Sequence, residues 1–445
     1  MTTEQTQPPV PRRRRRLVKW TIGLLVCYGL VELASLGVLY CVMPQASFEV
    51  LRMDREEVAR GDSDPVTSTE VIHPYLGWVH NPQLAVSEYV ADREVGVNQL
   101  GFKDDNPGLF KRGPDSFILG IAGGSQAWQI SWEAEEVIRK RLKEHPKLAG
   151  KTIRIVRMAL PGYKQPQQLM AYNYFLALGG EFDAVVNIDG FVDGVLSITD
   201  NAAMGTSLAY PRSWHARSIV MSDPRVSSDS YELLRLRAER QQMAKDAETS
   251  MFSWSPVYTV AWFYRDQSAK EKLIDLGIRL SKSQDDSYLH HGPPEPQPGG
   301  PEEEAEAARL WAQCSLQMNE LSKGFNTIYI HVLPPNQYLE GAKKLHAKEQ
   351  AYCIADHEPY AKVARSSYPK LVEAGNALTK RGVRFLDESK AFAEHEEPLF
   401  IDPFCHFNVD GSEIVAENIM KALSAAIDQQ TEKTAVGMLN GNLNR

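Results

Sequence analysis

Cysteine is scarce in this chain of 445 residues, and its five cysteines stand far apart. No CxxC pair and no cluster of histidine and cysteine occurs, so the sequence predicts no zinc site. Neither G-x-G-x-x-G nor a glycine loop followed by Lys-Ser/Thr is present, which argues against a nucleotide-binding loop. We therefore expect no metal and no cofactor.

Positive charge is also in short supply outside the N-terminus. The chain holds 49 Lys and Arg against 57 Asp and Glu, a net charge of -8. The first 20 residues alone carry +5, which leaves -13 for the remainder. An acidic body is a poor match for a polyanion, so we do not expect nucleic acid as a partner.

One long apolar run, residues 17–43, is interrupted only by Lys19 and Glu32. A helix of about 20 apolar residues suffices to cross a bilayer. The arginines at 12–16 predict a cytoplasmic N-terminus and an extracytoplasmic body. A cleavable signal peptide is the competing interpretation, but its apolar core usually has about 7 to 15 residues and ends at a small-x-small site. The longer run favours an uncleaved, single-pass anchor.

Glu32 lies inside this apolar run. A carboxylate in hydrocarbon is costly, and such residues often face a partner helix or a polar cavity. Glu32 therefore indicates either a membrane partner or a protonated carboxyl without any partner, and the sequence leaves both interpretations open.

A short apolar run at 117–122 ends at Gly123-Gly124-Ser125, and a helical segment is expected at 132–144. This turn presents Ser125 at the carboxyl end of a strand, which is the edge where open parallel sheets bind ligands. The start of the following helix offers free N–H groups to negative charge. Ser125 is therefore a candidate nucleophile. The alternative is that Ser125 caps the helix while the two glycines make the turn.

A serine hydroxyl needs a base to act as a nucleophile. Among eleven histidines, His406 has the most informative surroundings, because Asp402 precedes it by four residues and a helix is expected from 411 to 427. A carboxylate at that distance can orient the imidazole. Asp402 and His406 are therefore the candidate partners of Ser125.

Strand patterns alternate with helical ones along most of the chain after residue 115. Such βαβ alternation predicts a parallel sheet flanked by helices. It stops after Asp193, which indicates an insertion of about 194–301 over the active edge. The expected strands lie at 116–121, 153–158, 183–189, 327–333 and 383–387.

Taken together, these pieces resemble the SGNH (GDSL-type) hydrolase family, in the membrane-anchored bacterial form whose first block is Gly-Gly-Ser. The resemblance covers about residues 73–427 and matches Ser125 to the first block, Gly162 to the second, 190–193 to the third and Asp402 with His406 to the last. It implies a flavodoxin-like sheet. Two positions depart from the family pattern. One residue too many separates Asp402 from His406, and Val192 stands where an oxyanion-hole asparagine is expected.

The resemblance implies a serine esterase in which Ser125 attacks an ester carbonyl, His406 moves the proton and Asp402 steadies the imidazolium. The backbone N–H groups of Ser125 and Gly162 would form the oxyanion hole. Val192 cannot supply the third donor, so the hole is weakened unless another amide replaces it. The candidates for that replacement are Asn187, Gln126 and Asn336.

The family implies an ester hydrolase or acyl transferase acting on O-acyl groups of a cell-surface polysaccharide or another carbohydrate. The alternative is a catalytically silent binding or scaffold subunit of a cell-envelope polysaccharide system. If the body is exported, its compartment permits one disulfide, with Cys314 and Cys353 as a guess. The expected organisation is a basic tail (1–16), an anchor (17–43), a connecting and flanking region (44–115), a hydrolase-like domain (116–427) and a disordered tail (428–445).

Overall fold

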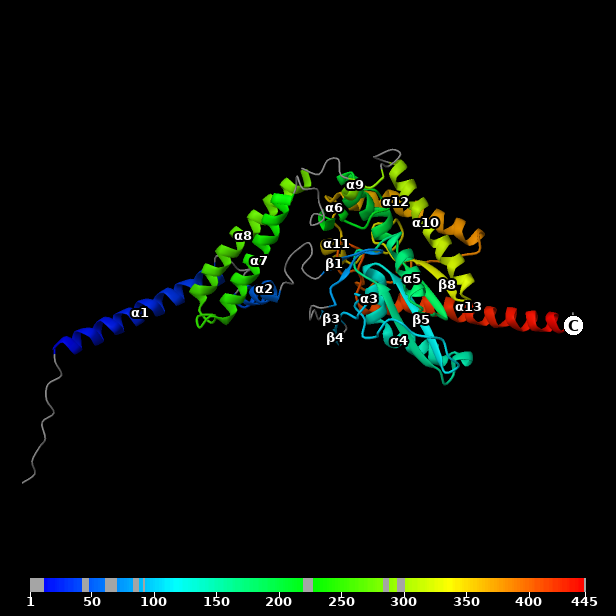
Figure 1. The fold of residues 1–445 in the computed structure, drawn as a ribbon, viewed down its shortest axis with the longest axis horizontal. Coiled ribbons are helices and arrows are strands. Elements are labelled where there is room, and N and C mark those ends of the chain that lie inside the picture. Colours follow the sequence, from blue (N-terminus) through cyan, green and yellow to red (C-terminus); the bar gives the residue numbers. More distant parts are fainter. Residues whose placement is uncertain are drawn as a thin grey trace, which may run out of the picture. The chain divides into compact units, whose positions relative to one another are not determined.

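The computed structural model contains two compact units (Figure 1). The helical unit is made of residues 1–68 and 222–284, and the sheet unit of residues 69–221 and 285–445. The structure describes residues 12–41, 48–60, 70–82, 88–90, 93–218, 227–282, 288–293 and 301–443.

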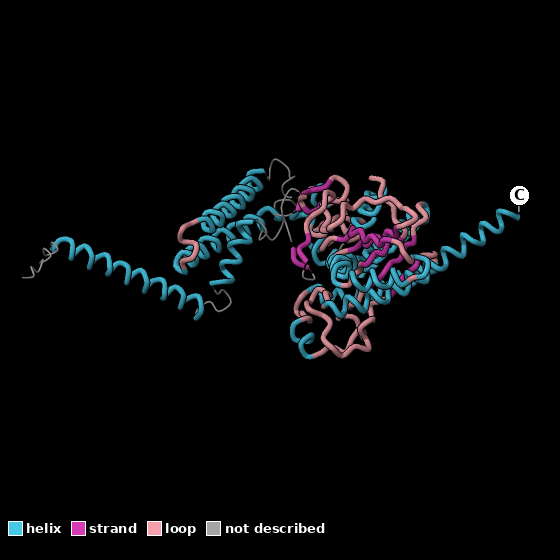
Figure 2. The backbone as a smooth tube through the Cα atoms, turned by 90° about the horizontal axis from the view of Figure 1, so that it is seen from below, coloured by secondary structure: helices cyan, strands magenta, loops and turns pink. Residues whose placement is uncertain are grey.

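A five-stranded parallel sheet forms the centre of the sheet unit (Figure 2). Its spatial order is β6-β5-β7-β8-β9, and every neighbouring pair is parallel. In chain order this is 2-1-3-4-5, an order shared by flavodoxin-like sheets. The predicted α/β class and parallel sheet are therefore confirmed. The strands are β5 (Ser116–Gly123), β6 (Thr152–Ala159), β7 (Ala184–Ile188), β8 (Ile328–Leu333) and β9 (Arg384–Asp387).

The strands are apolar along their length because helices cover both faces of the sheet. Every residue of β7 and β8 is buried, so these strands lack the alternation of a half-exposed sheet. One apolar layer includes Tyr172, Trp311 and Leu371, and the opposite layer includes Ile138 and Leu423. The first layer involves α5 (Gln167–Ala177), α10 (Pro301–Gly324) and α12 (Pro359–Lys380), and the second α3 (Ser125–Glu133), α4 (Glu135–Glu144) and α13 (Val409–Leu443).

Two helices differ from the sequence prediction. Helix α3 begins at Ser125, although the helix was expected from 132. Helix α13 continues to Leu443, where residues 428–445 were expected to be disordered. The smaller elements of the sheet unit are β1 (Glu70–His73), β2 (Gly77–His80), β3 (Glu88–Val90), β4 (Arg93–Val95), η1 (Pro146–Leu148), η2 (Val192–Asn201), η3 (Ala202–Met204), α6 (Trp214–Arg217), α9 (Tyr288–His291) and α11 (Ala347–Tyr352).

The flanking region before the sheet contributes to the sheet unit's core. Trp78 and Phe102 are buried in the same cluster as Tyr163, and the Tyr163 hydroxyl donates to the Trp78 carbonyl at 2.5 Å. The rings of Trp78 and Tyr163 meet edge to face, with centroids 4.9 Å apart. The flanking region therefore packs against the loop that follows β6 and stabilises it.

The helical unit contains α1 (Arg12–Cys41), α2 (Phe48–Arg60), α7 (Ser227–Thr249) and α8 (Pro256–Lys282). Within α1, Lys19–Leu39 is long and apolar enough to cross a membrane. The last two residues of the expected anchor, 42 and 43, and residues 1–11 of the basic tail lie outside the described residues.

The expected insertion, 194–301, divides between the two units. Residues 194–218 belong to the sheet unit, whereas α7 and α8 belong to the helical unit. There, Arg55 of α2 is fully buried and forms an ion pair with Glu248 of α7. The parts of the insertion at 219–226, 283–287 and 294–300 lie outside the described residues.

Candidate active site

Two glycines place Ser125 at the carboxyl edge of the sheet. Gly123 ends β5 with φ of +144°, and a Cβ atom there would come within 2.1 Å of the Ile188 carbonyl oxygen. A Cβ atom on Gly124 would lie 3.0 Å from the Tyr163 carbonyl oxygen. The chain can therefore turn from strand to helix this tightly because these positions lack side chains. Ser125 becomes the first residue of α3.

Ser125, His406 and Asp402 form one chain of hydrogen bonds. The Ser125 Oγ atom lies 2.7 Å from His406 Nε2, and His406 Nδ1 lies 2.5 Å from Asp402 Oδ2. An ionised carboxylate only accepts hydrogen bonds, so Nδ1 carries the proton and Nε2 is left to accept from the serine hydroxyl. The cap of α3 is Gly124, without a side-chain capping bond, and the Ser125 hydroxyl is instead directed at His406.

The loop that carries Asp402 and His406 accommodates the extra residue noted in the sequence. Cys405 adopts the left-handed conformation, with φ of +67°. Asp402 Oδ1 accepts hydrogen bonds from the backbone N–H groups of Phe404 at 2.8 Å and His406 at 3.2 Å. The loop therefore folds around the Asp402 carboxylate, and the His406 imidazole reaches this carboxylate despite the extra residue.

Asp402 is held in its ionised form. Burial raises the pKa of Asp402, but the hydrogen bond and the charge interaction with His406, together with the two backbone N–H groups, outweigh burial and leave this pKa below its ordinary value. The carboxylate is therefore available to orient the imidazole and to stabilise it once it is protonated.

A small pocket opens beside Ser125. The space open to the centre of a water molecule is only about 10 Å³, which is about the size needed for one water. Val192 is 8% exposed, and its Cγ2 atom lies 3.6 Å from where a Cβ atom on Gly124 would stand. The wall at this position is therefore apolar, as the sequence indicated. The pocket is lined by Gly124, Ser125, Gln126, Tyr163, Ile188, Asp189, Gly190, Phe191, Val192, Asp193 and Phe404.

The predicted replacements for the missing amide donor are occupied elsewhere or stand apart from this pocket. The Gln126 side chain lines the pocket, but its Nε2 atom donates to the Cys405 carbonyl at 2.8 Å. The Asn187 amide donates to Asp189 at 2.8 Å. Asn336 does not line the pocket; its Oδ1 atom accepts from the Tyr338 backbone N–H at 2.8 Å, and its buried Nδ2 atom has no hydrogen-bond partner among the described residues.

Gly162, the second predicted backbone donor, follows β6 with φ of +90°. The next residue, Tyr163, lines the pocket, whereas Gly162 itself does not. A Cβ atom on Gly162 would lie 3.9 Å from both Trp78 and Arg212. Part of the insertion, through Arg212, therefore lies beside this loop.

A buried polar network next to the pocket was not predicted from the sequence. Asp189 Oδ1 accepts from Trp311 Nε1 at 2.5 Å and is paired with His331 Nε2 at 2.6 Å. Asp193 Oδ1 accepts from the Gln165 backbone N–H at 2.6 Å. Polar residues inside otherwise apolar strand segments, such as His331, were the available signal.

The environment of Asp193 disfavours its ionised form. Burial and then the neighbouring Asp189 carboxylate raise the pKa of Asp193 well above its usual range, while the Gln165 N–H and Lys164 act in the opposite direction. Both aspartates line the pocket beside Ser125. Their hydrogen bonds therefore support the floor of the site.

Two further expectations concern cysteine and metals. Cys314 and Cys353 are both free and buried, so the guessed disulfide between them is wrong. Cys353 instead donates its thiol to the Phe400 carbonyl at 3.2 Å. Among the residues that the structure describes, no group of three or more His, Cys, Asp or Glu side chains is arranged to hold a metal ion.

The fold and the site together define a parallel α/β protein with a Ser-His-Asp chain at the carboxyl edge of its sheet. No protein-family model and no curated protein sequence matches this chain.

Proposed function

We propose that this protein is a serine esterase-type hydrolase or acyl transferase of the SGNH kind, anchored by α1 with its body outside the cytoplasm. The observation that carries the proposal is the hydrogen-bonded chain from Ser125 through His406 to Asp402. The three residues come from two loops at one sheet edge, and their order of contact is the one that nucleophilic catalysis requires.

The reaction begins with attack of Ser125 Oγ on the carbonyl carbon of an ester, while His406 Nε2 takes the hydroxyl proton. The tetrahedral intermediate collapses to an acyl-serine as the C–O bond to the alcohol breaks, and His406 returns the proton to the departing alkoxide. Water or a sugar hydroxyl then attacks the acyl-serine, with His406 again as base. Water gives hydrolysis, and a sugar hydroxyl gives acyl transfer.

The charge on the tetrahedral oxygen needs hydrogen-bond donors. The Ser125 backbone N–H belongs to the first turn of α3, where N–H groups have no partner within the helix. Losing one donor of an oxyanion hole typically lowers turnover by about 100- to 1,000-fold. Val192 therefore predicts a slow enzyme.

The pocket favours a small acyl group. The small space beside Ser125 argues against a long acyl chain. The acidic body is compatible with a neutral substrate such as an O-acylated carbohydrate. Acyl groups of a cell-surface polysaccharide are the substrate class that we propose.

Val192 also favours a second function. A binding or scaffold subunit of a cell-envelope polysaccharide system can keep the fold and lose the donor, because recognition does not require a stabilised oxyanion. An apolar wall in place of that donor is the specific observation for this alternative.

Hydrolysis of p-nitrophenyl acetate by the purified full-length protein in detergent tests the proposal. We expect Ser125→Ala and His406→Ala to lose the activity of the wild type, and His357→Ala, which alters an exposed histidine, to keep it. Equal rates for the wild type and Ser125→Ala would favour the binding subunit.

A further inference from the structure

Helices α7 and α8 form a hairpin, and its turn and the first part of α8 are uncharged and rich in aromatic residues. Residues 249–264 form a run of 16 without Asp, Glu, Lys or Arg. At its turn, the exposed fractions are 79% for Met251, 46% for Phe252 and 61% for Trp254. Large apolar side chains that gather at an exposed turn indicate an interaction surface. The aromatic residues of the run are Phe252, Trp254, Tyr258, Trp262, Phe263 and Tyr264.

This hairpin is attached to the apolar part of α1 through Glu32. The Glu32 carboxylate accepts from the Ser255 hydroxyl at 2.5 Å and from the Val257 backbone N–H at 3.1 Å. Val257 belongs to the first turn of α8, whose N–H groups favour negative charge. Glu32 therefore finds hydrogen-bond donors within its own chain. Figure 1 shows the α7–α8 turn beside α1.

The attachment point fixes the depth of the hairpin relative to α1. Glu32 precedes Leu39, the last residue of the apolar stretch, by seven positions. At a helical rise of about 1.5 Å per residue, these positions correspond to about 10 Å along the axis. The apolar stretch of 21 residues matches a hydrocarbon core of about 30 Å. Ser255 therefore lies about 10 Å inside the C-terminal boundary of the span.

We propose that the hairpin tip, residues 250–257, enters the bilayer leaflet next to the C-terminal end of α1. The partner is the boundary between lipid headgroups and acyl chains, where Trp and other aromatic side chains are favoured and apolar surfaces insert by about 5 to 10 Å. This inference rests on α1 crossing a membrane, which is part of the proposed function. It also gives Glu32 a role, because the carboxylate holds the tip against the span.

The arginine that contacts the tip is compatible with this placement. Arg55 is fully buried, so its guanidinium does not meet lipid, and it donates to the Ser253 carbonyl at 3.1 Å and to Thr259 Oγ1 at 3.4 Å. Its charge is balanced by Glu248. The guanidinium is buried and paired, the form in which charge is tolerated near hydrocarbon, whereas the Glu248 side chain is 27% exposed and begins the charged surface of α7.

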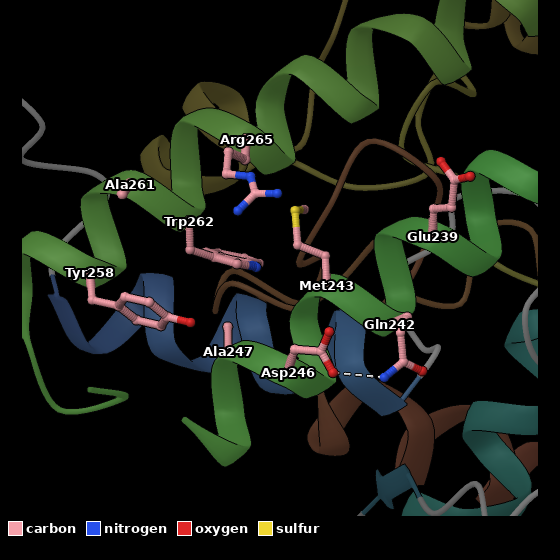
Figure 3. Close-up of a pocket in the computed structure, with 9 residues that line it drawn as sticks. All are labelled: Glu239, Gln242, Met243, Asp246, Ala247, Tyr258, Ala261, Trp262 and Arg265. Atoms are coloured by element: carbon pink, nitrogen blue, oxygen red, sulfur yellow. Dashed lines mark hydrogen bonds between the residues drawn. The ribbon is translucent and has the colours of Figure 1, made fainter. Parts of the chain in front are cut away.

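Charged residues flank the tip at unequal distances: α7 carries Asp246 and Glu248 beside the tip, whereas the first charge on α8 is Arg265. A pocket of about 300 Å³ lies between α7 and α8, with the rings of Tyr258 and Trp262 on one side and Met243 on the other (Figure 3). Asp246 and Arg265 line the same pocket. The aromatic side chains of this pocket therefore belong to α8, while α7 lines it with Asp246 close to the tip.

Spin labels on the full-length protein in liposomes test this placement. Single labels at Met251→Cys and at Tyr231→Cys compare two exposed positions of the helical unit, because Tyr231 is 70% exposed and lies near the other end of α7. Cys27→Ala and Cys41→Ala remove the cysteines of α1, and the other three are buried. The measurement is the collision rate of each label with oxygen, which enriches in lipid, and with a water-soluble nickel chelate.

We expect the label at 251 to collide with oxygen several-fold more often, and with nickel several-fold less often, than the label at 231. Equal nickel collision at both positions would overturn the proposal. If the label at 251 is shielded from both reagents and shows spin–spin broadening that depends on protein density, a second copy of the chain covers the tip and the lipid proposal is wrong. A label at Trp254→Cys repeats the test should Met251→Cys fail to fold.

Native Cys27, labelled alone in a Cys41→Ala chain, separates this inference from the proposed anchor. Cys27 is exposed on α1 within the apolar stretch. Oxygen access at Cys27 with nickel access at 251 would mean that α1 spans the bilayer while the tip stays in water. Nickel access at Cys27 would overturn the span and the tip together.

Discussion

Substituting Val192 by asparagine should raise esterase activity. Val192 lines the pocket beside Ser125, and in the proposed SGNH alignment it stands where the family has a donor asparagine. If that proposal holds, the amide of an asparagine at this position would face the oxyanion. Asparagine and valine differ little in volume, and the substitution therefore adds a donor without filling the pocket.

The substitution should change two separate quantities, turnover and folding stability. One donor to an oxyanion hole is worth about 100- to 1,000-fold in turnover, or about 3 to 4 kcal/mol. Burying an amide that has no ground-state partner costs about 1 to 3 kcal/mol of folding stability. We therefore expect kcat to rise by up to two or three orders of magnitude, while the melting temperature of the variant falls.

Initial rates with p-nitrophenyl acetate measure this effect, with circular dichroism to confirm folding. Val192→Asp is the matched control, because it has nearly the same shape but an ionised carboxylate accepts hydrogen bonds and repels an oxyanion. If Val192→Asn and Val192→Asp are equally slow while both remain folded, the pocket is not the oxyanion hole and the reasoning is refuted.

Three further predictions concern the triad, the turn and the buried Asp193. Asp402→Asn should lower kcat about 10,000-fold, as in serine proteases, because Nδ1 loses its carboxylate acceptor. An unchanged kcat would contradict the role of Asp402 in orienting His406. Gly123→Ala should destabilise the fold by more than about 3 kcal/mol in denaturant titrations, since its Cβ would clash with a backbone carbonyl, whereas Gly150→Ala, at an open turn, should cost about 1 kcal/mol. Asp193 has a raised folded pKa, so the folded state holds its proton longer and wild-type stability falls as pH rises above about 4. Asp193→Asn should remove this fall, and parallel pH profiles of the two proteins would show that Asp193 is ionised.

The sheet could be predicted because each strand is an apolar run buried on both faces. Apolar runs such as 328–333 are readily assigned as buried strands when helical segments separate them. The structure places all five strands within two residues of the prediction. The approach of Ser125 to His406 followed from topology, since both residues come from segments at the carboxyl edge of a parallel sheet.

Other features depend on tertiary contacts that periodicity does not reveal. Helix α3 begins seven residues early because the glycine turn leads directly into it. Cys405 adopts the left-handed conformation that lets Asp402 reach His406. Cysteine is neither glycine nor asparagine, so there was no reason in the sequence to expect this conformation. The donors for Glu32 come from a segment more than 220 residues later, so the sequence could show that Glu32 is unusual but not which groups it meets.

Labelling with a fluorophosphonate, followed by mass spectrometry of the peptides, tests most directly whether Ser125 is a nucleophile. The account predicts one modified residue, Ser125, in the full-length protein, and no modification in Ser125→Ala or His406→Ala. The absence of a label on Ser125 in both the wild type and the folded Val192→Asn variant would contradict it.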